Sequence, residues 1–144
     1  MPDNTATTNN TDMNNPTEMK APVDINDIPE LPGIDVKAGL VSTRGKTALY
    51  RRLLLKFRDA YQDFEQQFHA TQADGDFEAR VRLAHSVKGA AGSLGMHNVQ
   101  QAASALEQAC AENADTIDDL LAEILDELQR VIDSVAIIDV SADA

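Results

Sequence analysis

Apolar side chains recur at intervals of three and four residues through most of residues 46–135, and this spacing is the strongest constraint on the fold. It places the apolar residues on one face of an α-helix, whereas a half-buried strand would need strict alternation. Aromatic residues make up only 4% of the chain and Trp is absent, a composition that suits packed helices better than sandwiched sheets. We therefore expect an all-α protein.

The spacing and the turn residues together predict one short helix and four long ones. Asp35 is a plausible N-cap for the short helix, which ends before Gly45. The long helices are expected over 46–68 as one helix of about six turns, over 77–94, from near Asn98 to about Cys110, and from Ile117 to about Val135. Short connections between long helices force neighbours to run antiparallel. The predicted architecture is an up-and-down antiparallel four-helix bundle with a short additional N-terminal helix.

Charge divides the chain into three parts. Residues 1–30 have a net charge of −5, residues 31–88 have +3 and residues 89–144 have −10, which together give the total of −12. The first part contains four prolines among Asn and Thr and few large apolar residues, so it cannot bury enough surface to offset the entropy of ordering. We predict a disordered tail or linker over 1–30, a helical bundle over 31–138 and a C-terminal tail over 139–144.

Several classes of function are disfavoured by composition. A net charge of −12 argues against a nucleic-acid partner. No run of about eighteen apolar residues could cross a bilayer, and the N-terminus does not resemble a secretory signal. The single cysteine, Cys110, lies on an apolar helical stripe and is interpreted as a core residue. The three histidines have no zinc-binding spacing. We expect a cytoplasmic protein without a metal of its own.

The segment 77–94 contains the candidate functional residues. Helical spacing predicts a buried stripe made of Phe77, Ala84, Val87, Ala91 and Leu94. The same spacing predicts an exposed or half-exposed face made of Arg82, His85, Lys88, Gly89 and Gly92. A glycine inside a helix costs roughly 1 kcal/mol relative to alanine. Because two such glycines lie on the same side as the histidine, we infer that another protein approaches the imidazole there.

His85 has chemistry suited to that position. A histidine with an ordinary pKa of about 6.5 is largely neutral at physiological pH and offers a nucleophilic ring nitrogen. Lys88, one helical turn away, could neutralise charge on a phosphoryl group carried by His85. The alternative interpretation is an ordinary solvated helix face. His69 and His97 lack comparable surroundings and are predicted to be structural, with His97 left open as a residue at the rim of the same surface.

The run His85-Ser86-Val87-Lys88-Gly89-Ala90-Ala91-Gly92-Ser93-Leu94-Gly95 resembles the motif of the histidine-containing phosphotransfer (HPt) domain. In that motif an apolar residue and then Lys-Gly follow the histidine, and small residues lead to Leu-Gly. The likeness continues at Ala102, Ala103, Leu106 and Glu107. The stretches 31–35 and 48–54 are similar to the entry of the HPt modules at the C-terminus of bacterial hybrid sensor histidine kinases. The resemblance covers roughly residues 31–138.

The resemblance implies a phosphorelay intermediate in two-component signal transduction. His85 would accept a phosphoryl group from an aspartate of one receiver domain and pass it to an aspartate of another. Lys88 would be the charge partner, and Gly89 would give the receiver steric clearance. Arg82, Ser86 and Gly92 would contact the docked partner. The resemblance also implies that the chain has no kinase activity. It implies no intrinsic cofactor either, because the receiver domain supplies the Mg²⁺.

The expected partners are receiver (response regulator) domains, and the chain itself is expected to be a monomer. The sequence leaves open whether it stands alone or is joined in cis to a sensor histidine kinase. Two alternatives stay open. One is an HPt-like binding module that docks receivers without carrying phosphate. The other is a structural or oligomerisation bundle, in which the cleared face around His85 has no purpose. An exposed apolar patch beside His85 would argue against this second alternative.

Overall fold

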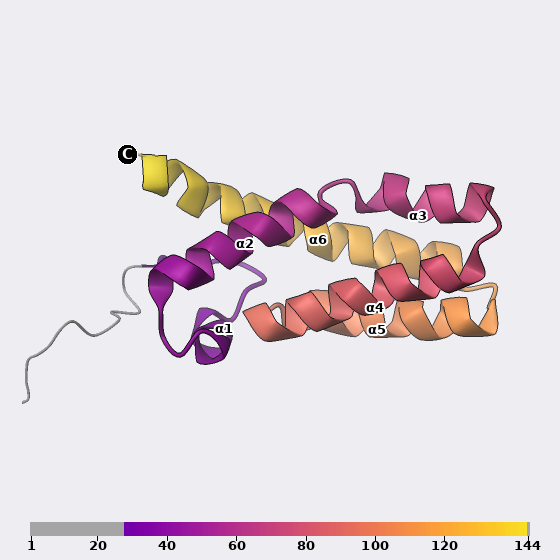
Figure 1. The fold of residues 1–144 in the computed structure, drawn as a ribbon, viewed down its shortest axis with the longest axis horizontal. Coiled ribbons are helices and arrows are strands. Elements are labelled where there is room, and N and C mark those ends of the chain that lie inside the picture. The colour runs from indigo at the N-terminus through magenta and orange to yellow at the C-terminus, as the bar shows by residue number, and fades with distance from the viewer. Residues whose placement is uncertain (1–27, 144) are drawn as a thin grey trace, which may run out of the picture.

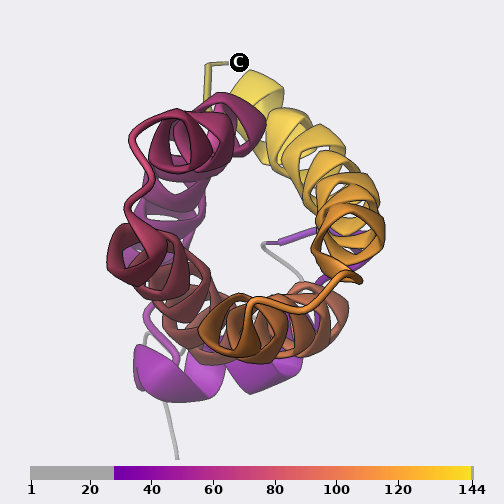
Figure 2. The same cartoon turned by 90° about the vertical axis from the view of Figure 1, so that its right-hand side faces the viewer.

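The computed structural model of the protein describes residues 28–143, and their side chains as far as Ile138. Its helices are α1 (Val36–Ser42), α2 (Thr47–Tyr61), α3 (Phe64–Ala73), α4 (Phe77–Leu94), α5 (His97–Glu112) and α6 (Ile117–Asp143). The arms α2–α3, α4, α5 and α6 run alternately up and down (Figure 1) and surround a common axis when viewed from one end (Figure 2). Within the described residues the backbone forms no strand. The predicted all-α bundle with a short N-terminal helix is confirmed.

The prediction of one continuous helix over 46–68 is wrong, because Gln62 and Asp63 separate α2 from α3. The side-chain amide of Gln67 donates a hydrogen bond to the carbonyl oxygen of Ala60 at 3.1 Å. In a continuous helix the Ala60 carbonyl oxygen would accept from a backbone N–H four residues later. The Gln67 side chain supplies a hydrogen bond to this oxygen where the helix stops. The sequence pattern does not reveal the break, because apolar residues keep helical spacing across it: Phe57, Tyr61, Phe64 and Phe68.

The core lies along the bundle axis, and every arm contributes to it. Its largest fully buried side chains include Tyr50, Leu54, Phe64, Phe68, Met96, Leu106 and Ile124. Four of the five residues predicted for the buried stripe of α4 are buried: Ala84, Val87, Ala91 and Leu94. Removal of this apolar surface from water is the main favourable term in folding.

Phe77 is an exception to the predicted stripe, because it is 50% exposed. The inward position near the start of α4 is taken by Arg80, which is only 6% exposed. The guanidinium carbon of Arg80 lies 5.0 Å from the centre of the Phe77 ring and 5.5 Å from that of Phe68. Two aromatic faces thus stabilise a buried cation. This arrangement turns the first residue of α4 outward.

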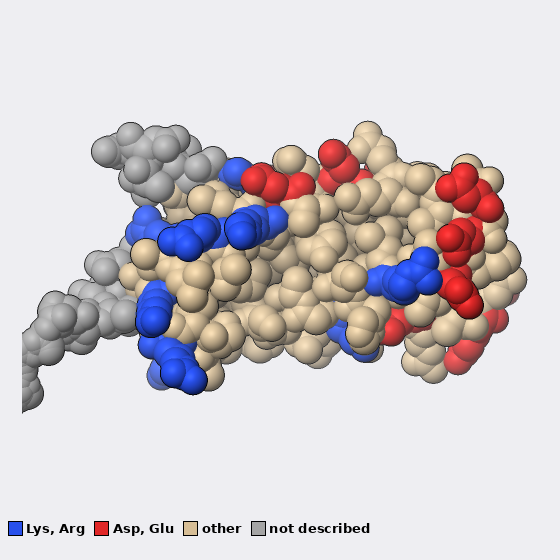
Figure 3. Space-filling view, viewed as in Figure 1, with Lys and Arg blue, Asp and Glu red and all other residues tan. Residues whose placement is uncertain are grey.

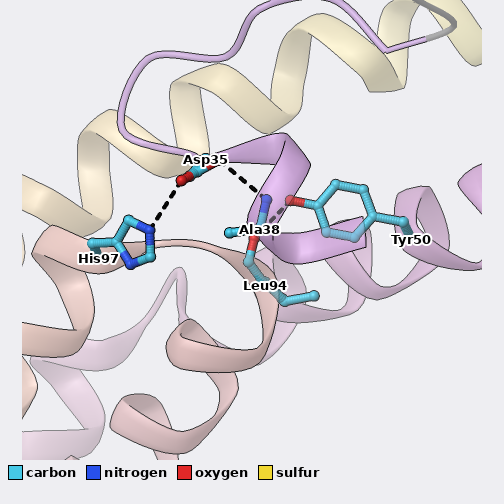
Figure 4. A network of polar contacts seen from close by, with 5 residues as sticks. All are labelled: Asp35, Ala38, Tyr50, Leu94 and His97. Atoms are coloured by element: carbon cyan, nitrogen blue, oxygen red, sulfur yellow. Dashed lines mark hydrogen bonds and ion pairs between the residues drawn. The ribbon is translucent and has the colours of Figure 1, made fainter. Parts of the chain in front are cut away.

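Helix α1 is fastened to the corner between α4 and α5. Gly95 ends α4 with a φ of +83°, a left-handed conformation that favours glycine, and its carbonyl oxygen accepts a hydrogen bond from the N–H of Asp35 at 2.7 Å. The Asp35 carboxylate caps α1 by accepting from the N–H of Ala38 at 3.1 Å, and it lies 3.2 Å from Nε2 of His97 (Figure 4). The predicted N-cap at Asp35 and the predicted helix end at Gly95 are confirmed.

At both ends, the packed or helical part of the chain extends beyond the predicted bundle boundaries of residues 31 and 138. Ile28 is buried in the core, so the part that packs begins before Leu31. The carbonyl oxygen of Pro32 accepts a hydrogen bond from the hydroxyl of Ser134 at 2.6 Å, which ties this entry segment to α6. Residues 1–27 of the predicted tail lie outside the described residues. At the other end, α6 continues to Asp143 through most of the stretch for which a tail is predicted.

Replacement of Tyr50 by Phe tests the attachment of α2 to α4. The buried Tyr50 hydroxyl donates to the carbonyl oxygen of Leu94 at 2.6 Å (Figure 4). Loss of the donor leaves a buried carbonyl without this partner, so Tyr50→Phe should lower the free energy of unfolding by about 1–3 kcal/mol. Urea denaturation measures this difference. An unchanged midpoint would show that the hydrogen bond contributes nothing net.

Candidate functional site

Helix α4 presents His85 to solvent. The helix begins at a cap formed by Asp76, whose carboxylate accepts from the N–H of Ala79 at 2.9 Å. Opposite its buried stripe, the His85 side chain is 66% exposed. Arg82 and Gly89 are also exposed, while Lys88 and Gly92 are half-buried, as the helical spacing predicted.

Glu107 of α5 brings the two ionisable residues of this face together. Its Oε2 lies 2.9 Å from Nδ1 of His85, and its Oε1 lies 2.7 Å from Nζ of Lys88. A carboxylate only accepts hydrogen bonds, so Nδ1 of a neutral His85 ring must carry the proton. The other ring nitrogen, Nε2, then keeps its lone pair. The contact therefore leaves the Nε2 lone pair free to accept a proton or to attack an electrophile.

Glu107 is held in its charged form. The hydrogen bond from Lys88, and after it the contact with His85, lowers the pKa of the Glu107 carboxyl below its ordinary value. The side chain is only 22% exposed, so little solvent competes for these contacts. His85 and Lys88 thus contact the same carboxylate, and Lys88 lies near the histidine as the helical spacing predicted.

The sequence pattern does not predict the contact of Glu107 with His85, although Glu107 is part of the family likeness. It lies 22 positions further along the chain and on another helix. Only the packing of α5 against α4 turns this separation into a hydrogen bond.

The two glycines of this face have different surroundings. A Cβ at Gly89 would meet no atom of the described residues within 4 Å, so their surface beside His85 is open there. A Cβ at Gly92 would lie 2.7 Å from Nε2 of Gln100. Gly92 therefore makes room for a side chain of α5, while Gly89 makes room for something outside the molecule.

An apolar groove lies on the other side of α4, between this helix and α2. It is lined by Leu53, Lys56, Phe57, Ala60, Tyr61, Ala90, Ser93 and Leu94. A second hollow continues past Ala60 and Tyr61 between α3 and α4, where Arg82 and Ser86 line it. Figure 3 shows the corresponding uncharged area between a basic end and an acidic end. The exposed large apolar side chains of the described residues, Val41, Phe77 and Ile137, line neither hollow, so these hollows do not decide against a purely structural bundle.

The remaining candidate residues have local partners. Nδ1 of His69 lies 2.8 Å from Oε1 of Gln72, and His97 pairs with Asp35. Cys110 is buried, which confirms its place in the core, and burial raises the pKa of its thiol. Among residues 28–143 we find no group of three or more potential metal ligands. No helix in the same range combines the length and hydropathy needed to span a bilayer.

Comparison with known proteins identifies the family. The family model described as Hpt domain matches residues 49–135. The fold is similar to the crystal structure of the HPT domain from the Hpt sensor hybrid histidine kinase from Shewanella, with a TM-score of 0.64, 18% sequence identity, and coverage of 74% of this chain and 92% of that one. No curated protein matches the chain. The chain belongs to the Hpt domain family, as its motif indicated, and this membership supports a role in two-component phosphotransfer.

Replacement of Glu107 by Gln tests the charge of this cluster. Because the folded-state pKa of Glu107 is lowered, its contribution to stability is complete above its ordinary pKa of 4.5 and is lost as the pH falls through the folded value. The difference in unfolding free energy between the wild type and Glu107→Gln should therefore shrink as the pH falls from about 7 to about 3. Urea unfolding at several pH values measures it. The exposed acid Glu123, changed to Gln, is the control, and a difference independent of pH would contradict the assignment.

Proposed function

We propose that this protein is a phosphorelay intermediate that carries a phosphoryl group on Nε2 of His85. The group would come from a phosphorylated aspartate of one receiver domain and pass to an aspartate of another. The observation that carries this proposal is the contact of Glu107 with Nδ1 of His85, because it leaves Nε2 free on an exposed face. Membership of the Hpt domain family supports the same reaction class.

The transfer conserves atoms and charge through a single displacement. The Nε2 lone pair of His85 attacks the phosphorus of the aspartyl phosphate, and the bond from phosphorus to the aspartate oxygen breaks. The aspartate leaves as a carboxylate with the electron pair. Positive charge develops on the imidazole as the N–P bond forms, and the Glu107 carboxylate 2.9 Å from Nδ1 stabilises it. The second transfer is the reverse of these events with a different aspartate.

Lys88 supplies positive charge beside the reacting nitrogen. Its ammonium group is bound to Oε1 of Glu107, whose other oxygen contacts His85. From this position Lys88 would neutralise charge on the phosphoryl oxygens. The proposal includes no cofactor bound by this chain, since Mg²⁺ would be supplied by the receiver domain.

The partner would dock over Gly89 and the neighbouring groove. Gly89 has open space where a Cβ would lie, so the rim of a receiver active site could come close to His85. Arg82 and Ser86 line the hollow on the same side of α4, which makes them candidates for contact with the receiver. Gly92 would act less directly, through Gln100. The proposal includes a monomeric chain and leaves open whether a sensor histidine kinase is joined to it in cis.

Transfer of radioactive label from a phosphorylated receiver domain tests the phosphoacceptor. In the presence of Mg²⁺ the wild-type chain should acquire label that is labile in acid and stable in alkali, as expected for a phosphohistidine. The variant His85→Gln should acquire none, while His69→Gln, which changes an exposed histidine of α3, should behave as the wild type. Label on His85→Gln would reject His85 as the acceptor. Receiver binding without any label on the wild type would favour the docking module instead.

Replacement of Gly89 by Leu tests the steric role of this position. The added side chain points into open space and relieves the helix cost of glycine, so the melting temperature should not fall, whereas phosphoryl transfer should fall by about tenfold or more because the receiver is held away. Ala105→Leu places the same side chain on an exposed part of α5 that faces α6, and it should leave both properties unchanged. Normal transfer by Gly89→Leu would contradict the steric role.

A further inference from the structure

Basic side chains gather at the end of the bundle formed by α1 and the start of α2 (Figure 3). Residues 28–56 contain six bases and two acids, a net charge of +4. One of these acids, Asp35, is already paired with His97. The exposed bases are Lys37, Arg44, Lys46, Arg52 and Lys56, which we call the basic end. This end favours an anionic partner.

The apolar groove between α2 and α4 begins at the basic end. Lys56 belongs to both, since it is exposed on α2 and also lines the groove. Most of the other lining side chains are apolar, among them Leu53, Phe57 and Leu94. A surface of this kind fits an extended segment that combines carboxylates with apolar side chains.

The chain contains such a segment immediately before the described residues. Residues 1–27 have five acids and one lysine, a net charge of −4. In the last ten of them, Glu18, Asp24 and Asp27 are interspersed with apolar residues: Met19, Val23 and Ile25. The chain enters the fold at the same end of the bundle as α1 (Figure 1).

The length of this segment allows it to reach the groove. Ten extended residues span up to about 33–36 Å. Helix α2, with 15 residues, is only about 22 Å long. A segment that starts at Ile28 can therefore extend along α2 as far as Ala60. Because it is tethered, its effective concentration at the groove is in the millimolar range, so a weak affinity is sufficient.

We propose that residues 18–27 bind in the groove between α2 and α4 of their own chain. The carboxylates of Asp24 and Asp27 pair with Arg52 and Lys56, and the apolar side chains lie on the groove floor. The bound segment occupies the groove over which the partner of the proposed function would also dock. This intramolecular contact is separate from the proposed phosphotransfer. Its test does not depend on whether the protein carries a phosphoryl group.

A spin label on the full chain tests this contact directly. The label is attached to a cysteine introduced within the segment, Ala21→Cys. The native Cys110 is buried and does not compete for the reagent. Relaxation of backbone amides is then compared between groove residues such as Ala60 and Ser93 and the far-side residue Ala122, which is exposed on α6. We expect stronger relaxation in the groove at about 10 mM salt and its loss at about 1 M, where the screening length falls from about 30 Å to about 3 Å.

Matched variants separate the pairing from general charge. Asp24→Asn with Asp27→Asn should reduce the groove effect by about threefold, the size expected from two exposed ion pairs. Asp3→Asn with Asp12→Asn removes the same charge from the distal part of the segment and should leave the effect unchanged. Equal relaxation in the groove and on α6, or no response to the first pair of changes, would overturn the proposal. Relaxation transferred from a labelled to an unlabelled molecule would assign the groove to a second copy and overturn it as well.

Discussion

The close approach of α4 and α5 is the constraint on which the site depends. Several buried positions of these helices are occupied by alanine, such as Ala84 and Ala91 on α4 and Ala103 on α5. Small residues let helix backbones approach one another, and Gly92 extends this by making room for Gln100. At this separation a carboxylate of α5 reaches two side chains of α4. Without the approach, the exposed histidine would have no defined tautomer and no nearby charge pair.

The site therefore combines a rigid support with an open face. Glu107 is half-buried and contacts both His85 and Lys88, while no atom of the described residues covers Gly89. Electrostatic groups held in place in this way need little reorganisation when charge develops on a bound phosphoryl group. The outward face of His85 stays accessible to a partner. Such access is needed by the proposed relay, in which one receiver would give the phosphoryl group and another would take it.

Charge is distributed along the bundle so that its two ends differ. The basic end lies over α1 and the start of α2, and the acidic end lies where the α3–α4 and α5–α6 connections meet (Figure 3). The groove and His85 lie between them. An approaching protein thus meets opposite potentials along one face, which orients it before contact is made. The proposed intramolecular contact and partner docking would both use the groove on this face.

The amino-acid sequence by itself determined the helices, the exposed face of α4, the cap at Asp35, the helix end at Gly95 and the family. These are local properties, because spacing along one helix defines its faces and a single residue can cap or end it. Tertiary structure alone decided the break after Tyr61, the exchange of Phe77 for Arg80 in the core, and the contact of Glu107 with His85. The physical reason is that periodicity says which side of a helix is buried. It does not say how far one helix is shifted along its neighbour, and that shift selects which side chains meet.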